Sequence, residues 1–81
     1  MSKTIEQIIE FYPEETFLKA DGFDDAIIGI DEISMRLIYS VSKCLQILSK
    51  DMPTDEAMEY FYFNVFGAYV GGKTPIWCQD F

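Results

Sequence analysis

The chain has 81 residues, of which 14 are acidic, 6 are basic and none is histidine, and its formal net charge is −8. So short a chain favours a single domain over residues 1–81, and its charge argues against direct binding to nucleic acid or to an anionic membrane surface, since both need Lys and Arg. The lack of histidine removes the commonest general base and the commonest zinc ligand. Hydrophobic residues make up 49% of the chain and aromatic residues 16%, which predicts a core rich in large apolar side chains.

The first predicted element is a helix that begins at Thr4 and ends before Pro13. Apolar side chains recur at helical spacing on one stripe, formed by Ile5, Ile8, Ile9 and Tyr12. Pro13 ends the helix because the residue before a proline is disfavoured in the α conformation. Residues 14–22 then connect this helix to the next element.

Two strands follow, over residues 25–31 and 35–39, and the short loop between them predicts an antiparallel hairpin. The alternation of side chains puts an apolar set on one face of each strand. The simplest register pairs Ile30 with Met35, Ile28 with Leu37, and Ala26 with Tyr39. All six of these side chains are then expected on one face.

A second helix is predicted after Ser40, whose hydroxyl suits a helix N-cap. Its buried stripe consists of Val41, Cys44, Leu45 and Leu48. Cys44 is therefore expected to be a core thiol rather than a nucleophile. Because 2 cysteines are too few for a disulfide framework and nothing resembles a secretory signal, we expect a reducing, cytoplasmic location.

The third helix, predicted to be capped by Thr54, has more apolar residues than one buried face requires. An ordinary core face is formed by Met58, Phe61, Tyr62, Val65 and Tyr69. Three further aromatic residues, Tyr60, Phe63 and Phe66, lie outside this arc. Because a helix that is apolar nearly all round is buried on more than one side, we interpret these three as a subunit or partner interface. The alternative is a central helix that its own chain covers on both sides.

A glycine-rich turn and a short strand over residues 75–79 complete the chain. The expected fold is α+β, with a small antiparallel sheet made of the hairpin and the C-terminal strand. Three helices pack with this sheet, and the elements follow in the order α-β-β-α-α-β.

Residues 67–74, GAYVGGKT, match the P-loop pattern of phosphate-binding proteins. A working P-loop leaves a strand and opens a helix, whose N-terminus helps to bind phosphate. Here a helix is predicted before the pattern and a strand after it, so we predict a helix C-terminal glycine followed by a turn. A looser anion site, with Lys73 and the glycine amides as donors, stays open.

A small-ligand pocket is the second possibility for this region. Acidic side chains gather at both ends of the first predicted strand, but their spacing fits no calcium-binding loop, and we predict no metal site. A pocket would lie between the start of that strand and the glycine-rich turn. Its candidate residues are Asp24, Asp25, Tyr69, Gly71, Gly72, Lys73 and Thr74.

No serine or cysteine has an evident activating partner in the sequence. We therefore predict no catalytic residue, no cofactor and no enzymatic activity.

Aromatic side chains could also line a pocket, although an aromatic stripe at helical spacing is more typical of a core. The candidates are Tyr39, Tyr60, Tyr62, Tyr69 and Trp77.

Several stretches resemble a family of short proteins that tailed bacteriophages encode: GFDDAIIGI at 22–30, RLIYS at 36–40, and FNVFGAYVG at 63–71 followed by TPI at 74–76. No activity is established for that family, so the resemblance implies a setting rather than a mechanism. The setting would be the cytoplasm of the host cell, with a host protein or a small signalling molecule as the binding target.

The leading hypothesis is a small phage-type accessory protein that forms a homodimer or larger homo-oligomer through the third helix and acts by binding a protein partner. The second is a protein that binds or sequesters a small ligand or nucleotide. The third is an acidic mimic of DNA.

Overall fold

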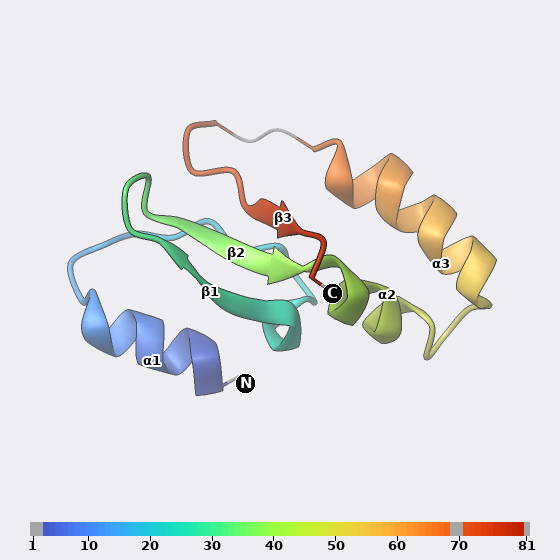
Figure 1. Cartoon of the computed structure of the whole chain (residues 1–81), viewed down its shortest axis with the longest axis horizontal. Helices are drawn as coiled ribbons and strands as arrows, with labels where there is room; N and C mark the ends of the chain where they lie inside the picture. Colours follow the sequence, from blue (N-terminus) through green and yellow to red (C-terminus); the bar gives the residue numbers. More distant parts are fainter. Residues whose placement is uncertain (1–2, 69–70, 81) are drawn as a thin grey trace.

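In the computed structural model, which describes residues 3–68 and 71–80, the chain forms the predicted α+β fold with its elements in the predicted order (Figure 1). The elements are α1 (Lys3–Phe11), β1 (Ile27–Asp31), β2 (Arg36–Ser40), α2 (Val41–Leu48), α3 (Thr54–Tyr60) and β3 (Ile76–Cys78), with a 3₁₀ turn η1 (Asp24–Ala26) before β1 and a π-helical segment η2 (Phe61–Phe66) after α3. α1 lies beside β1, and α3 lies at the other end of a molecule that measures 39 × 25 × 23 Å.

The strands form a mixed sheet in the order β1-β2-β3. β1 and β2 pair antiparallel as predicted, but β3 runs parallel to β2, with Tyr39 opposite Trp77. The prediction of an antiparallel sheet is therefore wrong for its C-terminal strand. Parallel neighbours need a crossover connection of a dozen or more residues, which the segment containing α2 and α3 provides. β2 becomes the central strand.

The hairpin turn differs from the prediction because Asp31 pairs with Arg36, which leaves four residues in the loop. Met35 was expected in the strand, but its φ of 55° places it in the left-handed region, and its N–H donates to the Asp31 carbonyl at 2.7 Å. The Asp31 carboxylate accepts from the Ile33 N–H at 3.2 Å and from the Ser34 hydroxyl at 2.6 Å. One short acidic side chain thus fixes the turn and, with it, the register of both strands.

An irregularity in β1 also changes which of its side chains reach the core. The register shifts between Ile27 and Gly29, so Ile27 is buried while Ile28 is exposed. A bulge adds an unpaired residue, and the side chains on its two sides then alternate out of phase. The predicted pairs are all wrong: Ala26 lies in η1, Ile30 pairs with Leu37, and Ile27 pairs with Tyr39.

The core lies between α1, the sheet and α2, with Tyr39 at its centre. The Tyr39 hydroxyl accepts a hydrogen bond from the Ala20 N–H at 2.7 Å, which ties the connecting segment to the sheet. Ile9 is exposed, so α1 buries a narrower stripe than its sequence predicted. The core consists of Ile5, Ile8, Phe23, Ala26, Ile27, Leu37, Tyr39, Val41, Cys44 and Phe61.

α2 forms as predicted and begins at its expected cap. The Ser40 hydroxyl accepts from the Lys43 N–H at 3.2 Å and donates to the Asp80 carboxylate at 2.7 Å. The cap satisfies one of the N–H groups that a helix start leaves unpaired. The carboxylate adds a favourable charge near the positive end of the helix dipole. Val41 and Cys44 are the fully buried residues of this helix.

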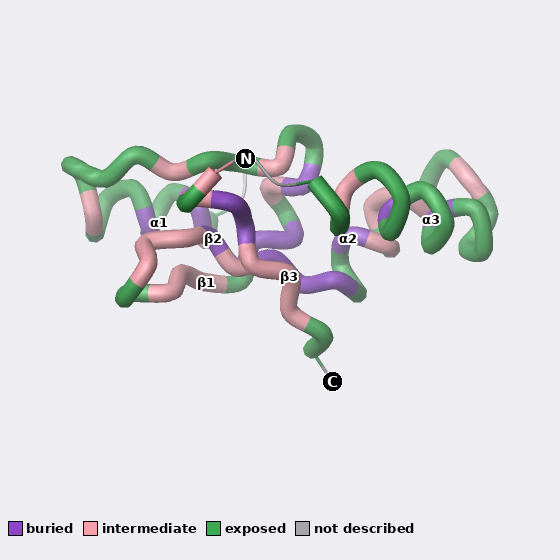
Figure 2. Tube along the Cα trace, turned by 90° about the horizontal axis from the view of Figure 1, so that it is seen from above, coloured by how far each residue is buried: buried purple, intermediate pink, exposed green. Residues whose placement is uncertain are grey.

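α3 begins without a side-chain cap. Pro53 occupies the N-cap position and Thr54 is the first helical residue, so the predicted Thr54 cap is wrong. A proline there suits the helix start because it has no N–H to satisfy. Figure 2 shows that most of α3 is exposed, whereas the buried segments gather around the sheet.

The buried face of α3 and η2 is also narrower than predicted. Ala57 and Phe61 are fully buried, but Met58 and Tyr62, which we expected in the core, are exposed. Tyr69, the last residue of the predicted core face, lies outside the described residues.

Candidate functional site

The exposed aromatic residues of α3 and η2 are the first candidate site. Phe63 is 79% exposed, Phe66 47% and Tyr60 46%, while Phe61 in the same segment is 0% exposed. The alternative of a central helix covered on both sides by its own chain is therefore wrong. π-helical segments are rare and frequently occur at functional sites, so the backbone and the exposure indicate the same segment.

These three residues have different neighbours. Phe66 contacts the rings of Phe61 and Tyr62, with centroid distances of 6.2 and 5.4 Å. Tyr60 and Phe63 line a separate shallow hollow, which we call the α3 hollow; its other lining residues are Met52, Glu56, Glu59 and Asn64. An interface centred on Tyr60 and Phe63 would have Phe66 outside its centre.

A second hollow, which we call the Trp77 cleft, shares Tyr60 and Asn64 with the α3 hollow. Its volume of about 360 Å³ falls in the range of small-molecule sites. Three separate parts of the chain form it: the connecting segment, the α3–η2 helix and β3. The other lining residues are Leu18, Lys19, Ala20, Asp21, Phe23, Val65, Ala68, Pro75 and Trp77.

Trp77 is held by ring contacts rather than by a hydrogen bond. Its ring lies 5.1 Å from that of Tyr39 and 5.4 Å from that of Phe61, the latter edge to face. Its indole N–H is buried and has no partner among the described residues. An unpaired buried donor costs about 1–3 kcal/mol, which the two ring pairs, each contributing about 0.5–1.5 kcal/mol, can offset.

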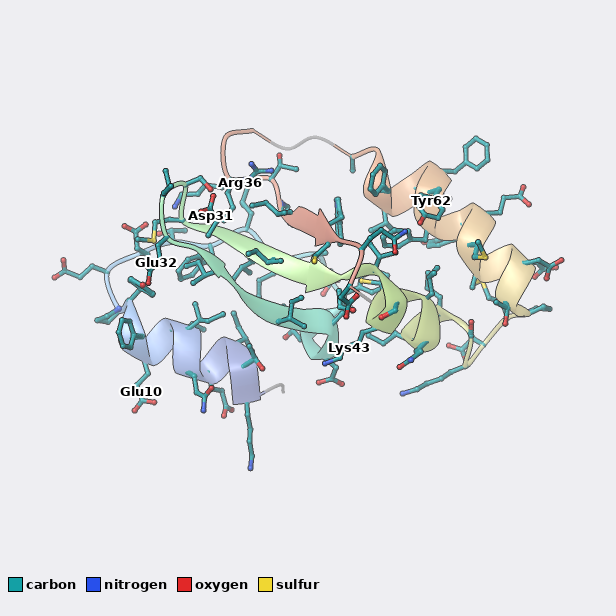
Figure 3. All side chains as sticks on the ribbon, in the orientation of Figure 1. Glu10, Asp31, Glu32, Arg36, Lys43 and Tyr62 are labelled. Carbon is teal, nitrogen blue, oxygen red and sulfur yellow. The ribbon has the colours of Figure 1, made fainter. Side chains whose placement is uncertain are left out.

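The structure separates the two halves of the predicted ligand loop. The Thr74 carbonyl accepts a hydrogen bond from Arg36 at the turn end of β2, whereas Asp25 lines a hollow with Lys43, just beyond the other end of β2. Figure 3 shows Arg36 and Lys43 at these opposite ends. Five strand residues correspond to about 15 Å, so no single pocket joins the two groups. Gly71, Gly72 and Lys73 lie with Thr74, Asp24 lies with Asp25, and Tyr69 is outside the described residues.

Lys73, the proposed anion donor, already has protein partners. Its ammonium donates to the Glu15 carboxylate at 3.2 Å and to the Met35 carbonyl at 3.1 Å, and it lies 5.8 Å from the ring centroid of Phe17. The turn itself is closed by the Thr74 N–H and hydroxyl, which both donate to the Gly71 carbonyl. These contacts fasten the turn to the hairpin and the connecting segment, and an anion would have to displace Glu15 from Lys73.

The ionisable groups of the core are held in their neutral forms. Burial raises the pKa of the Cys44 thiol to about 12, and burial likewise raises the pKa of the Tyr39 hydroxyl to about 12. Cys44 is therefore protonated at neutral pH, as expected of a core thiol. Within residues 3–68 and 71–80, no group of three or more acidic or cysteine side chains is placed to hold a metal ion.

No family model matches this chain, and no curated protein or solved structure is significantly similar to it. The resemblance to short bacteriophage proteins therefore stays a prediction. In the part of the chain that the structure describes, no helix has the length and apolar character needed to cross a membrane.

Sequence reasoning named some of the cleft residues and missed others. Tyr60 and Trp77 do line a cleft, whereas Tyr39 lies in the core. Phe23 was missed because it precedes the first predicted strand in a stretch interpreted as a connection, and Pro75 was missed because it was interpreted only as the first residue of the C-terminal strand. The available signal was the apolar content of residues 17–23, which is higher than a solvent-exposed linker needs.

Proposed function

We propose that this chain acts by binding a protein surface, and that its partner in the α3 hollow is a second copy of itself. The observation that carries this proposal is the exposure of Phe63, which is 79% exposed two residues after the fully buried Phe61. Covering a phenylalanine side chain contributes about 1.5–3 kcal/mol relative to leaving it in water. The same segment therefore offers one ring to the core and another to a partner.

The composition of the α3 hollow supports an interface. Aromatic residues and Met are enriched at interface centres, and charged residues are depleted there but common at the rim. The hollow contains Tyr60, Phe63 and Met52 together with the acidic Glu56 and Glu59. A standard interface takes about 800 Å² from each partner, which is about one-seventh of the 5535 Å² that this chain exposes.

The acidic residues give the proposed self-association a characteristic dependence on salt. Two copies that meet at the hollow bring Glu56 and Glu59 of each copy close together, and the net charge of −8 on each chain adds to the repulsion. Added salt screens this repulsion. We therefore expect the dimer to become tighter as salt is added, whereas binding of a basic partner at the same place would become weaker.

Light scattering coupled to size-exclusion chromatography, over a range of micromolar concentrations, tests the proposal. We expect the wild-type chain to show the mass of a dimer and Phe63→Ser to show that of a monomer. Ile33→Ser is the matched control, because Ile33 is 96% exposed at the hairpin turn, far from α3. A monomeric wild type at every concentration, or equal effects of the two substitutions, would contradict the proposal.

Binding rather than catalysis is proposed because two of the most reactive side-chain types in the chain, a thiol and an ammonium group, are held in inactive settings at Cys44 and Lys73. Cys44 is a protonated core thiol and Lys73 is paired with Glu15. A phage accessory role, which the resemblance suggests, would make a host protein a further partner. A pull-down from infected host cells is the experiment that would find it.

A further inference from the structure

The Trp77 cleft combines aromatic walls with a fixed geometry. Phe23 from the connecting segment, Tyr60 from α3 and Trp77 from β3 all line it. Phe23 belongs to the core, and the Trp77 ring is held between Tyr39 and Phe61. Rings that are already held by packing lose little freedom when a ligand arrives, which lowers the entropic cost of binding.

An acidic hollow adjoins the cleft and shares Lys19 and Asp21 with it; Gly22, Asp24 and Asp25 complete its lining. The Lys19 ammonium lies 3.6 Å from the Asp24 carboxylate, so its charge is already matched. Among the residues that the structure describes, Asp21 and Asp25 have no ion pair. The margin of the cleft is therefore negative, and the net charge of −8 strengthens the attraction for cations.

We propose that the Trp77 cleft binds a small organic ammonium ion with an apolar or aromatic body. The body packs against Tyr60 and Trp77, and the ammonium group faces Asp21. Three properties favour this ligand over a neutral or anionic one: the apolar lining, the unmatched carboxylate at the margin, and the attraction of aromatic ring faces for cations. The volume of about 360 Å³ suits a single-ring compound.

This site does not depend on self-association. Tyr60 lines both hollows, but the charged margin belongs to the connecting segment, and Trp77 belongs to β3. A monomeric chain would still present the cleft. The two proposals therefore fail independently, and the ligand test can be run on Phe63→Ser as well as on the wild type.

Trp77 provides a direct readout, because it is the only tryptophan in the chain. Its fluorescence is followed while the protein is titrated with 2-phenylethylamine and, separately, with 3-phenylpropionate, which carries the same ring with the opposite charge. We expect a saturable change with the amine and binding at least about tenfold weaker with the carboxylate, since a tenfold difference requires only about 1.4 kcal/mol. Backbone amide shifts of residues 19–23, measured by NMR, should saturate at the same amine concentration.

Two substitutions and one control complete the test. Asp21→Asn removes the unmatched charge at an exposed position and should weaken binding of the amine by about tenfold. Ala68→Phe adds a ring to the cleft wall and should abolish binding, and Ile33→Ser should change nothing. Asp21→Asn keeps the test valid if Ala68→Phe does not fold. Equal affinity for the two probes, undiminished binding in Asp21→Asn, or no saturable change in either readout would overturn the proposal.

Discussion

α2 and the α3–η2 helix pack against each other, yet they are stabilised in different ways. α2 begins at the Ser40 side-chain cap and buries Val41 and Cys44. The α3–η2 helix begins without a side-chain cap, changes from α to π geometry and leaves Phe63 largely in water. One copy of the chain therefore supplies both the cap and the buried contacts of α2. The α3–η2 helix, by contrast, carries more apolar side chains than one copy of the chain buries.

The sharpest test of this difference lies within η2 itself. Phe61→Ala should destabilise the domain by about 3–5 kcal/mol, because it leaves a cavity beside Trp77 in a closed core. Phe63→Ala, measured by urea unfolding at low protein concentration, should change stability by no more than about 0.5 kcal/mol. The wild type, but not Phe63→Ala, should then become more stable as its concentration rises, since self-association stabilises the folded state. Comparable losses in the two variants would show that Phe63 is covered within its own chain.

The next largest expected difference is in the free energy of unfolding when residues at the starts of α2 and of α3 are substituted. Ser40→Ala removes the bonds to the Lys43 N–H and to Asp80, and should cost about 1–2 kcal/mol. Thr54→Ala removes no cap bond from α3 and should lie within about 0.5 kcal/mol of the wild type. Thermal unfolding of both variants measures the difference. A larger loss in Thr54→Ala would mean that α3 begins differently in solution.

Lowering the pH should destabilise the N-terminus of α2, because the Asp80 carboxylate that accepts from Ser40 becomes protonated. The Ser40 hydroxyl, as the main cause, holds the pKa of Asp80 below its ordinary value of 3.8. The stabilisation is therefore fully present above pH 3.8 and is lost as the pH falls through the lowered pKa. Asp80→Asn and Ser40→Ala should both lose less stability on acidification than the wild type does. Unfolding curves in that acidic range that are parallel for all three proteins would contradict the assigned contact.

The smallest expected effect concerns Tyr62, whose hydroxyl accepts an exposed hydrogen bond from Gln79 at 3.2 Å. Tyr62→Phe should cost at most about 0.5 kcal/mol, because water replaces the lost bond. It should also leave the mass in solution unchanged, since Tyr62 does not line the α3 hollow. Dissociation of the dimer by Tyr62→Phe would move the interface to the side of η2 that carries Phe66.

The parts of the fold that the sequence predicted correctly depend on local patterns. The stripe that includes Val41 and Cys44 is readable because a helix repeats every 3.6 residues, and the cap at Ser40 is readable because a serine hydroxyl suits a helix start. The register of the hairpin was not readable, because the left-handed Met35 and the bulge near Ile28 are single-residue events that leave the apolar pattern unchanged. The parallel pairing of β3 is a contact between distant segments, which no local pattern encodes.

The candidate sites were likewise predictable only where a local pattern encodes them. The exposure of Tyr60, Phe63 and Phe66 was predictable, because they exceeded the apolar content of one helical face. The Trp77 cleft was not, since its walls come from three segments and part of its lining lies in a stretch interpreted as a connection. The proposed pocket between Asp24 and Lys73 failed because it placed the glycine-rich turn near the start of the first strand, whereas Lys73 and Thr74 contact Met35 and Arg36 at the hairpin-turn end of the sheet.

The central claim, that a second copy covers the α3 hollow, is tested most directly by intermolecular nuclear Overhauser effects in a mixture of isotope-labelled and unlabelled chains. Only contacts between copies appear in an isotope-filtered spectrum. We expect contacts from the rings of Tyr60 and Phe63 in one copy to the same region of the other, as a two-fold interface requires. Contacts confined to the exposed Phe11 and Ile33 at the other end of the molecule, or none at all, would contradict the account.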